Sequence, residues 1–360
     1  MVDHQAMTEP PDHTQDWYQL ATQELSRLSR KVRSHDPLDL ITLAGIAQGM
    51  TASVGRSETL VVQAMSAPLG DRLIANLVHV GILSTRIGLG LNYSGRQLEQ
   101  LTLAGLLHDI GIFSVPPSLI QKPGKLTPQE RAILEQHPEA GFKALRQLGP
   151  DYDWLATVVR QAHERWSGQG YPQRLKGSEI HPFAQVIGLA DVFEALVSPR
   201  PYRRHMLPHQ ATRELLRHER GAFSRTVLKA LVEQLSVYPL CTKVRLSSGD
   251  EGVVIRLNPR FPMRPVIQVG DEDSGSELTS VIDLSSTPDL CVFDAVAPPE
   301  PQFLSRSLHG TAPAPSEDEP HSFSDRFSAL LEGLDEIAST IQQVVESQGE
   351  SLDSGPSSVS

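Results

Sequence analysis

The chain has 360 residues, of which 39% are hydrophobic and 21% charged, so its composition allows a packed core and its length suggests two domains with additional segments. Its formal net charge of -11 argues against a nucleic-acid polymer or an anionic membrane as a partner, because both favour a basic surface. With two cysteines and no apolar run near the roughly 20 residues of a membrane span, we expect a cytoplasmic protein without a disulfide framework.

Helical periodicity begins near the start of the chain and continues to about residue 235. Residues 1–15 are polar and are expected to be disordered. From residue 16 onward the apolar side chains recur at steps of three and four: Trp17, Leu20, Ala21, Leu25 and Leu28. We therefore expect an N-terminal helical region over residues 16–68.

A helix start is visible in "TPQERAILEQH", residues 127–137. Thr127 is the expected N-cap, Pro128 takes the first helical position, and Glu130 completes a capping box. Pro138 predicts that this helix breaks or kinks after His137.

The pattern changes at Tyr238. "TKVRLSSGDEGVVIRL", "RPVIQVG" and "SVIDLS" are short segments rich in Val and Ile, separated by turn residues, which is typical of strands. They predict a small antiparallel barrel or sandwich over residues 237–297. Residues 298–320 are rich in Pro, Ser and acid, as in a disordered linker.

The last segment is helical again by pattern, over residues 321–348. Its apolar residues step by four and three alternately, which is a heptad seam: Phe323, Phe327, Leu330, Leu334, Ile337, Ile341 and Val344. A lone helix of this length cannot bury such a seam, so residues 323–345 are expected to meet a second copy, a signalling partner or a groove on the same chain. Residues 349–360 are expected to be disordered.

Six residues on or at the ends of predicted helices are candidate metal ligands: His79, His108, Asp109, His137, His163 and Asp191. A single histidine on an apolar helix is more often an ordinary core residue. The adjacent pair His108 and Asp109 is a stronger signal, although a buried carboxylate bonded to a local donor would have the same sequence. Imidazole and carboxylate without thiolate suit iron, manganese or a similar divalent ion.

Several motifs in a fixed order support the metal interpretation: "HDIG", "KPGKLTPQE", "HPEAG", "HERW", "GYP", "LADVFEAL" and "RPYR". Over roughly residues 70–235 the chain resembles the HD-GYP family of bacterial phosphodiesterases. The resemblance implies a mainly α fold, an HD-superfamily helical bundle over residues 69–236. It is followed by a small C-terminal β-barrel or SH3-like domain and then the tail helix.

The resemblance also implies the roles of the candidate residues. His79, His108, Asp109 and Asp191 would hold one metal ion, and Asp109, His137 and His163 a second, with Asp109 bridging. His108 and Asp109 would be the catalytic pair. The substrate implied is cyclic di-GMP, opened to pGpG or GMP, with these residues binding it: Arg200, Arg203, Gly170, Tyr171 and Pro172.

Some positions depart from the family pattern. Ile112 stands where the family has a lysine, Ala162 replaces the first of two histidines, and Ser167 replaces an acid. Ala75 stands where some members have a glutamate that supports a third metal, so two ions are expected. We expect an enzyme, slow if the lysine contributes to proton transfer. The alternatives are a catalytically weak module that binds the nucleotide or scaffolds partners, and a relative that hydrolyses a hybrid cyclic dinucleotide.

Overall fold

The fold is described from a computed structural model that covers residues 14–66, 70–198, 206–218, 221–258, 260–270, 280–297 and 299. The predicted tail helix (321–348) and its seam (323–345), the predicted disordered end (349–360), and Arg200 and Arg203 lie outside these residues, as does the predicted linker except for residue 299. The described residues form two compact units.

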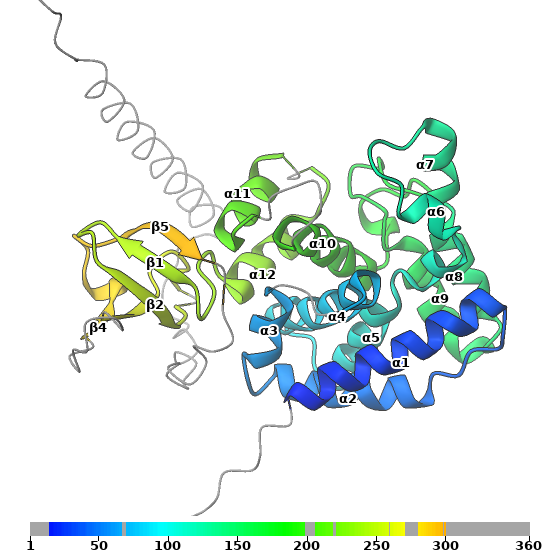
Figure 1. The fold of residues 1–360 in the computed structure, drawn as a ribbon, viewed down its shortest axis with the longest axis horizontal. Helices are drawn as coiled ribbons and strands as arrows, with labels where there is room; N and C mark the ends of the chain where they lie inside the picture. The colour runs from blue at the N-terminus through cyan, green and yellow to red at the C-terminus, as the bar shows by residue number, and fades with distance from the viewer. Residues whose placement is uncertain are drawn as a thin grey trace, which may run out of the picture. The chain divides into compact units, whose positions relative to one another are not determined.

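The first unit is helical and contains α1 to α10 and nearly all of α12 (Figure 1). Its helices are α1 (Thr14–Ser34), α2 (Ile41–Val54), α3 (Thr59–Ala64), α4 (Arg72–Gly90), α5 (Gly95–Leu107), α6 (Pro117–Ile120), α7 (Pro128–Leu134), α8 (His137–Arg146), α9 (Asp153–Gln161), α10 (Pro182–Val197) and α12 (Arg225–Leu235). Short 3-10 helices follow α5 (η1, Ile110–Ser114), α8 (η2, Pro150–Tyr152) and the loop after α9 (η3, Gly177–Glu179).

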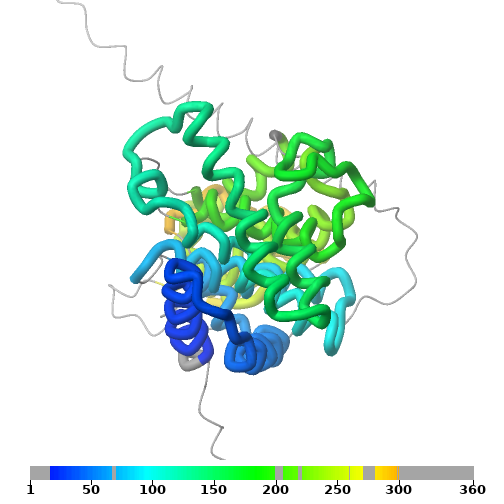
Figure 2. Tube along the Cα trace, turned by 90° about the vertical axis from the view of Figure 1, so that its right-hand side faces the viewer, coloured from blue at the N-terminus to red at the C-terminus, as the bar shows by residue number. Residues whose placement is uncertain are grey.

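Helices α1 and α2 pack on the rest of this unit rather than forming a separate region. Helix α1 lies along α2 and also contacts α4 and η1 (Figures 1 and 2). Ala21, Leu25 and Leu28 are fully buried, as the periodicity predicts. Leu20 is 43% exposed, which corrects the prediction, and Tyr18 takes an inward position instead. The inward face of α1 is therefore rotated slightly from the one that the apolar residues alone indicate.

Small residues bring α4 and α5 together at the centre of the unit. A side chain on Gly105 would lie 2.9 Å from the Cα atom of Gly81, so the two backbones are in close contact at this point. The surrounding side chains of both helices, such as Leu77, Leu83 and Leu101, are fully buried. This crossing fixes the carboxyl end of α5, where His108 and Asp109 follow.

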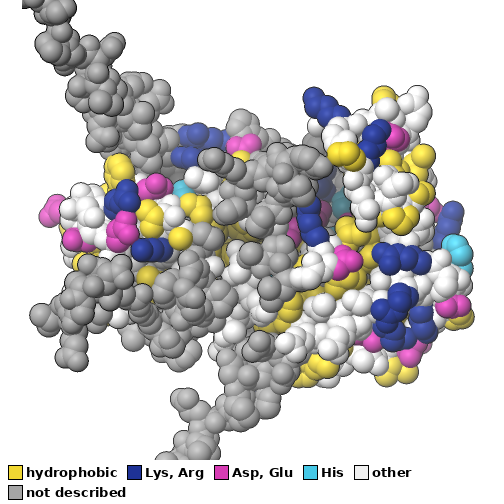
Figure 3. Space-filling model, in the orientation of Figure 1, with side chains coloured by type: hydrophobic (Ala, Val, Ile, Leu, Met, Phe, Trp, Pro, Cys, Tyr) yellow, Lys and Arg dark blue, Asp and Glu magenta, His cyan; other side chains and the backbone are white. Residues whose placement is uncertain are grey.

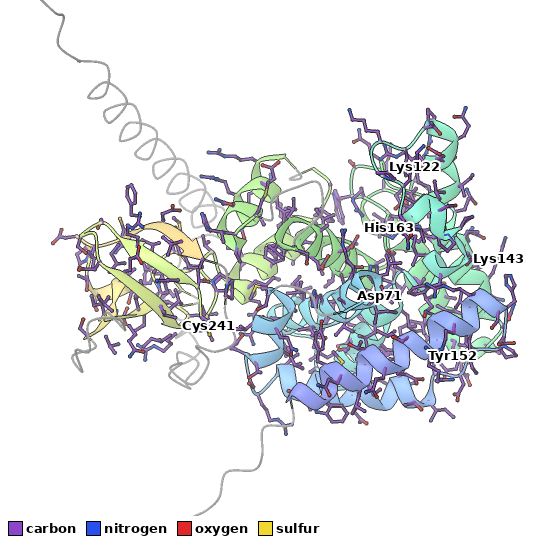
Figure 4. The ribbon with its side chains drawn as sticks, in the orientation of Figure 1. Asp71, Lys122, Lys143, Tyr152, His163 and Cys241 are labelled. Atoms are coloured by element: carbon purple, nitrogen blue, oxygen red, sulfur yellow. The ribbon has the colours of Figure 1, made fainter. Side chains whose placement is uncertain are left out.

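Local signals in the sequence account for the helix ends. Asp71, labelled in Figure 4, caps α4 by accepting a hydrogen bond from the Leu73 amide at 2.9 Å. The predicted capping box at the start of α7 is confirmed: the Thr127 hydroxyl accepts from the Glu130 amide, and Glu130 accepts from the Thr127 amide. The predicted break lies earlier than expected: α7 ends at Leu134, and α8 begins at His137 with Pro138 in its first turn, where a proline is tolerated, so the break precedes His137 instead of following it.

The surface of the first unit carries basic side chains over the carboxyl end of α1 (Figure 3). Lys31 and Arg33 lie in the last turn of this helix, where cations complement the helix dipole. Helix α4 is long and apolar enough to cross a membrane by length and composition, but most of it is buried in the unit, as in the central helix of a core.

The second unit combines α11 (Pro208–His218) with a five-stranded antiparallel sheet. The strands are β1 (Lys243–Leu246), β2 (Glu251–Arg256), β3 (Val266–Val269), β4 (Ser280–Asp283) and β5 (Val292–Ala297), and η4 (Leu284–Ser286) follows β4. The strand order is β4-β3-β2-β1-β5. The predicted strands are therefore confirmed, but within the described residues β4 and β5 do not pair, so the sheet is open rather than a closed barrel.

Candidate metal centre

The end of α5 places His108 and Asp109. Helix α5 stops at Leu107, and Asp109 precedes η1, so the chain turns sharply at this pair. The His108 ring is fully buried, and its Nδ1 lies 2.9 Å from the Gly105 carbonyl oxygen. A carbonyl only accepts, so Nδ1 carries the proton and donates it. The Nε2 atom then faces the interior, and no described atom hydrogen bonds to it.

Gly111 brings His137 to the same place. A side chain at Gly111 would collide with the backbone of His137 and Gly141 in α8, so only glycine allows η1 and α8 to pack this closely. The Nδ1 of His137 lies 2.7 Å from the Leu134 carbonyl oxygen. As in His108, this donation directs Nε2 inward.

Asp109, His137 and His163 form the centre of the site. Their facing atoms all lie within 4.8 Å of one another. The Asp109 Oδ1 atom is 2.7 Å from His163 Nε2 and 3.1 Å from His137 Nε2, and the two Nε2 atoms are 2.9 Å apart. The buried, unpartnered Nε2 of His108 and this convergence of ligand atoms fit a divalent metal ion.

Asp191 extends the cluster from α10. Its carboxylate lies 3.7 Å from His108 Nε2 and 3.9 Å from His163 Nδ1, and His108 Nε2 is also 3.7 Å from Asp109. The two carboxylates are about one fifth exposed, whereas the three histidines are buried. His163, labelled in Figure 4, follows the end of α9. The structure thus brings five of the six predicted ligands together.

The charges of the cluster depend on one another. Burial would raise the pKa of Asp109, but the imidazoles of His108, His137 and His163 hold it well below its ordinary value. Burial likewise opposes ionisation of Asp191, while His108 lowers its pKa. Burial lowers the pKa of His108, yet Asp109 and Asp191 raise it to about 9. Both carboxylates are therefore anionic at neutral pH, as metal ligands must be.

His79 is the predicted ligand that the structure places elsewhere. Its ring is fully buried, with Nε2 2.9 Å from the Tyr18 hydroxyl and Nδ1 3.3 Å from Glu194. Among the described residues, its ring makes no hydrogen bond or ion pair with Asp109 or Asp191. Asn76, which the sequence analysis overlooked, instead lies 3.4 Å from Asp191.

The loop after α9 covers one side of the cluster. The Tyr171 ring stacks on His163 at a centroid distance of 5.0 Å and an angle of 6°. A side chain on Gly170 would collide with the backbone of residues 163–165, so glycine is required there. Pro172 follows through a cis peptide bond. Burial raises the pKa of the Tyr171 hydroxyl, with Asp109 adding to the effect.

Glu164 holds this loop in place, a role that the sequence analysis also missed. Its buried carboxylate accepts hydrogen bonds from the backbone amides of Gln173, Arg174 and Leu175, at 2.6, 3.1 and 3.0 Å. The signal in the sequence is that Glu164 directly follows His163, so the residue that holds the loop is adjacent to a residue of the cluster. Ile112 and Ala162, the departures from the family pattern, are buried apolar residues, and Ser167 is exposed.

Comparison with known proteins agrees with this fold. An HD domain profile matches residues 54–227, and a KOW domain associated with HD domains matches residues 243–303. Cyclic di-GMP phosphodiesterase PA4108 of Pseudomonas aeruginosa is 30% identical over 241 residues, which cover 67% of this chain and 58% of that protein.

Two further relatives are similar over shorter stretches. A cyclic di-GMP phosphodiesterase of Thermotoga maritima is 37% identical over 155 residues, 43% of this chain and 42% of that protein. A 3'3'-cGAMP-specific phosphodiesterase 2 of Vibrio cholerae is 31% identical over 160 residues, 44% of this chain and 31% of that protein. The chain spans less than two thirds of the length of each of these curated relatives.

The helical unit thus contains an HD domain, and its histidine and aspartate cluster is a possible metal site. Within that class the chain belongs to the HD-GYP family, and a KOW domain associated with HD domains follows its HD domain.

Proposed function

We propose that the protein is a metal-dependent phosphodiesterase that hydrolyses cyclic di-GMP to pGpG or GMP in bacterial second-messenger signalling. The observation that carries the proposal is the convergence of Asp109, His137 and His163 beside the unpartnered Nε2 of His108. The relatives named as cyclic di-GMP phosphodiesterases support the choice of substrate.

Two divalent ions, iron or manganese, are proposed for the site. Asp109, His137 and His163 would hold one, and His108, Asp109 and Asp191 the other, with Asp109 shared between them. When bound, such ions supply an activated water and neutralise charge on the phosphodiester. The chain itself fixes the ligands: the carbonyls of Gly105 and Leu134 orient two of the imidazoles.

The loop of Gly170, Tyr171 and Pro172 is proposed as one wall of the substrate site, because Tyr171 covers His163 from outside the cluster. Arg200 and Arg203 remain the candidates for gripping phosphate oxygens, since planar guanidinium groups bind them in pairs.

A catalytically weak module that binds the nucleotide is the second candidate. It is favoured by Ile112, which is only 6% exposed and offers no proton donor at a position where the family has lysine. The resemblance to a 3'3'-cGAMP-specific enzyme also keeps a hybrid cyclic dinucleotide among the substrates to be tested.

The test is a product assay on the purified full chain loaded with Mn²⁺, using cyclic di-GMP and, separately, 3'3'-cGAMP. We expect pGpG or GMP from cyclic di-GMP. Asp109→Ala should lower the rate by on the order of 10²-fold or more and remove bound metal, because one carboxylate serves both ions.

Arg131→Gln is the matched control, because its ion pair with Glu135 lies on the exposed face of α7 and contributes little. Binding of cyclic di-GMP without product, in a protein that holds its metal, would favour the weak module. Turnover of 3'3'-cGAMP alone would identify the hybrid dinucleotide as substrate.

A further inference from the structure

His163 and Asp191 reach the metal centre from two helices that pack against each other. His163 follows the end of α9, and Asp191 lies within α10. The two helices are closest at Gly188, where a side chain would lie 2.6 Å from the Ala162 carbonyl oxygen and 3.2 Å from Nη1 of Arg165. Ala162 directly precedes His163, and Gly188 lies on the same face of α10 as Asp191, three residues before it. This contact therefore brings the two ligands together.

Arg165 folds back over the end of α9 at this contact. Ala162 is the last residue of that helix end, and Nη1 of Arg165 lies 3.5 Å from its carbonyl oxygen. The same nitrogen donates a hydrogen bond to the Glu164 carbonyl oxygen at 3.0 Å. Carbonyls at the carboxyl end of a helix lack partners within the helix and carry partial negative charge, so a guanidinium stabilises them.

Phe223 packs against the guanidinium of Arg165. The guanidinium carbon lies 5.2 Å from the centre of the ring, which is within the range of a cation–π contact, and Phe223 is only 4% exposed. The next residue is held by the same segment, since the Trp166 amide donates to the Ala222 carbonyl oxygen at 2.8 Å. Arg165 and Trp166 are therefore fastened to the segment that precedes α12.

The two ligands differ in how much they depend on this fastening. The carboxylate of Glu164 is occupied by the amides of the loop, so Arg165 is the side chain that joins the chain beside His163 to Phe223. Asp191 has a second support, because α10 also packs against α4. A change at Arg165 should therefore move His163 more than Asp191.

We infer that Arg165 is a positioning residue of the metal centre: it holds His163 in the cluster by joining the end of α9 to Phe223. It acts on the ions through His163 and is not itself a ligand. The inference rests on the metal site proposed above, in which His163 belongs to one ion and Asp191 to the other. Loss of Arg165 should therefore weaken the first ion selectively.

The experiment is a titration of the metal-stripped full chain with Mn²⁺, which gives the affinity of each ion, together with the melting temperature. His163→Gln identifies the affinity that belongs to the first ion, because it removes one of its ligands. Arg165→Gln should weaken that ion by about tenfold, as expected when the support of a ligand is lost, and leave the other within about twofold. Arg165→Lys, which keeps the charge but not the planar group, should recover part of the affinity.

Phe223→Leu tests the same link without changing Arg165. It removes the aromatic face, so the first ion should weaken by about threefold while the second is unchanged. Arg146→Gln is the matched control, because Arg146 also lies over a phenylalanine, Phe142, at 5.8 Å. Its ion pair with Asp153 is at the start of α9, at the opposite end of the helix from the cluster, so both affinities should stay within about twofold.

Equal weakening of both ions in Arg165→Gln would overturn the inference, because Arg165 would then not act through His163. A lower melting temperature with unchanged affinities would overturn it as well, since the role of Arg165 would be purely structural. If Arg165→Gln does not fold, the same outcomes in Phe223→Leu decide. A wild-type protein that binds no ion would contradict the proposed metal centre itself, an outcome that the titration distinguishes from the others.

Discussion

His108 is the residue on which the electrostatics of the site depend most. Its Nδ1 donates to Gly105, and its Nε2 is 3.7 Å from the carboxylates of both Asp109 and Asp191. Burial alone would lower its pKa, but the two carboxylates raise it to about 9. Without metal, His108 is therefore a cation at neutral pH, and a metal ion must displace its proton.

This proton makes metal binding depend on pH. Between pH 7 and pH 8.5 we expect the apparent affinity for Mn²⁺ to rise by up to about tenfold per pH unit, because one proton leaves His108 when the ion binds and less His108 is protonated as the pH approaches 9. Titration calorimetry at several pH values measures it. An affinity that is flat over this range would show that His108 is already neutral in the metal-free protein.

The stability of the metal-free protein should change in the opposite direction. A histidine whose pKa is raised by folding stabilises the protein fully below its ordinary pKa of about 6.5, and this contribution disappears as the pH rises through about 9. The melting temperature of the stripped protein, followed over the same pH range, should therefore fall. Asp109→Ala provides the comparison, because it removes one of the two charges that raise the pKa.

At the scale of elements, the position of α8 depends on the absence of a side chain at Gly111. The backbone of His137 and Gly141 occupies the space that a Cβ atom would need. Backbone cannot move aside as a flexible side chain can, so an added methyl must displace the start of α8. The first residue of α8 is His137, so this displacement reaches the metal centre directly.

Gly111→Ala should therefore lower both stability and metal binding. We expect a loss of about 1–3 kcal/mol in the free energy of unfolding, typical of overpacking, and a clear loss of Mn²⁺ affinity. Denaturant unfolding and metal titration measure the two effects. Gly45→Ala in α2 is the matched control, because nothing lies within 4 Å of its added Cβ. If Gly111→Ala binds metal like the wild type, the close approach does not place His137.

The sequence predicted where the helices lie better than which face of each helix points inward. The capping box at Thr127 is a local signal and is confirmed, whereas the break expected after His137 comes a few residues earlier, between Leu134 and His137. Which residues His79 contacts depends on how α4 rotates between α1 and α10, a tertiary effect that no local pattern contains. Tyr18 was overlooked for the same reason, since its partner His79 lies 61 residues further along the chain.

At the scale of the whole molecule, the sequence indicated a helical domain followed by a small β domain, and the structure and the domain profiles agree. The ordered motifs identified the predicted ligands because the motifs lie at the ends of helices that pack together. Five of these ligands meet in one cluster. Closure of the β domain into a barrel depends on pairing between strands far apart in the sequence, such as β4 and β5, and periodicity cannot predict it.

The central claim is that this cluster holds metal ions for hydrolysis. Anomalous diffraction from crystals grown with Mn²⁺ tests it most directly, because it locates each ion independently of activity. We expect one peak bound by Asp109, His137 and His163, and a second beside His108 and Asp191. A protein that hydrolyses cyclic di-GMP with no anomalous peak at these residues would contradict the account.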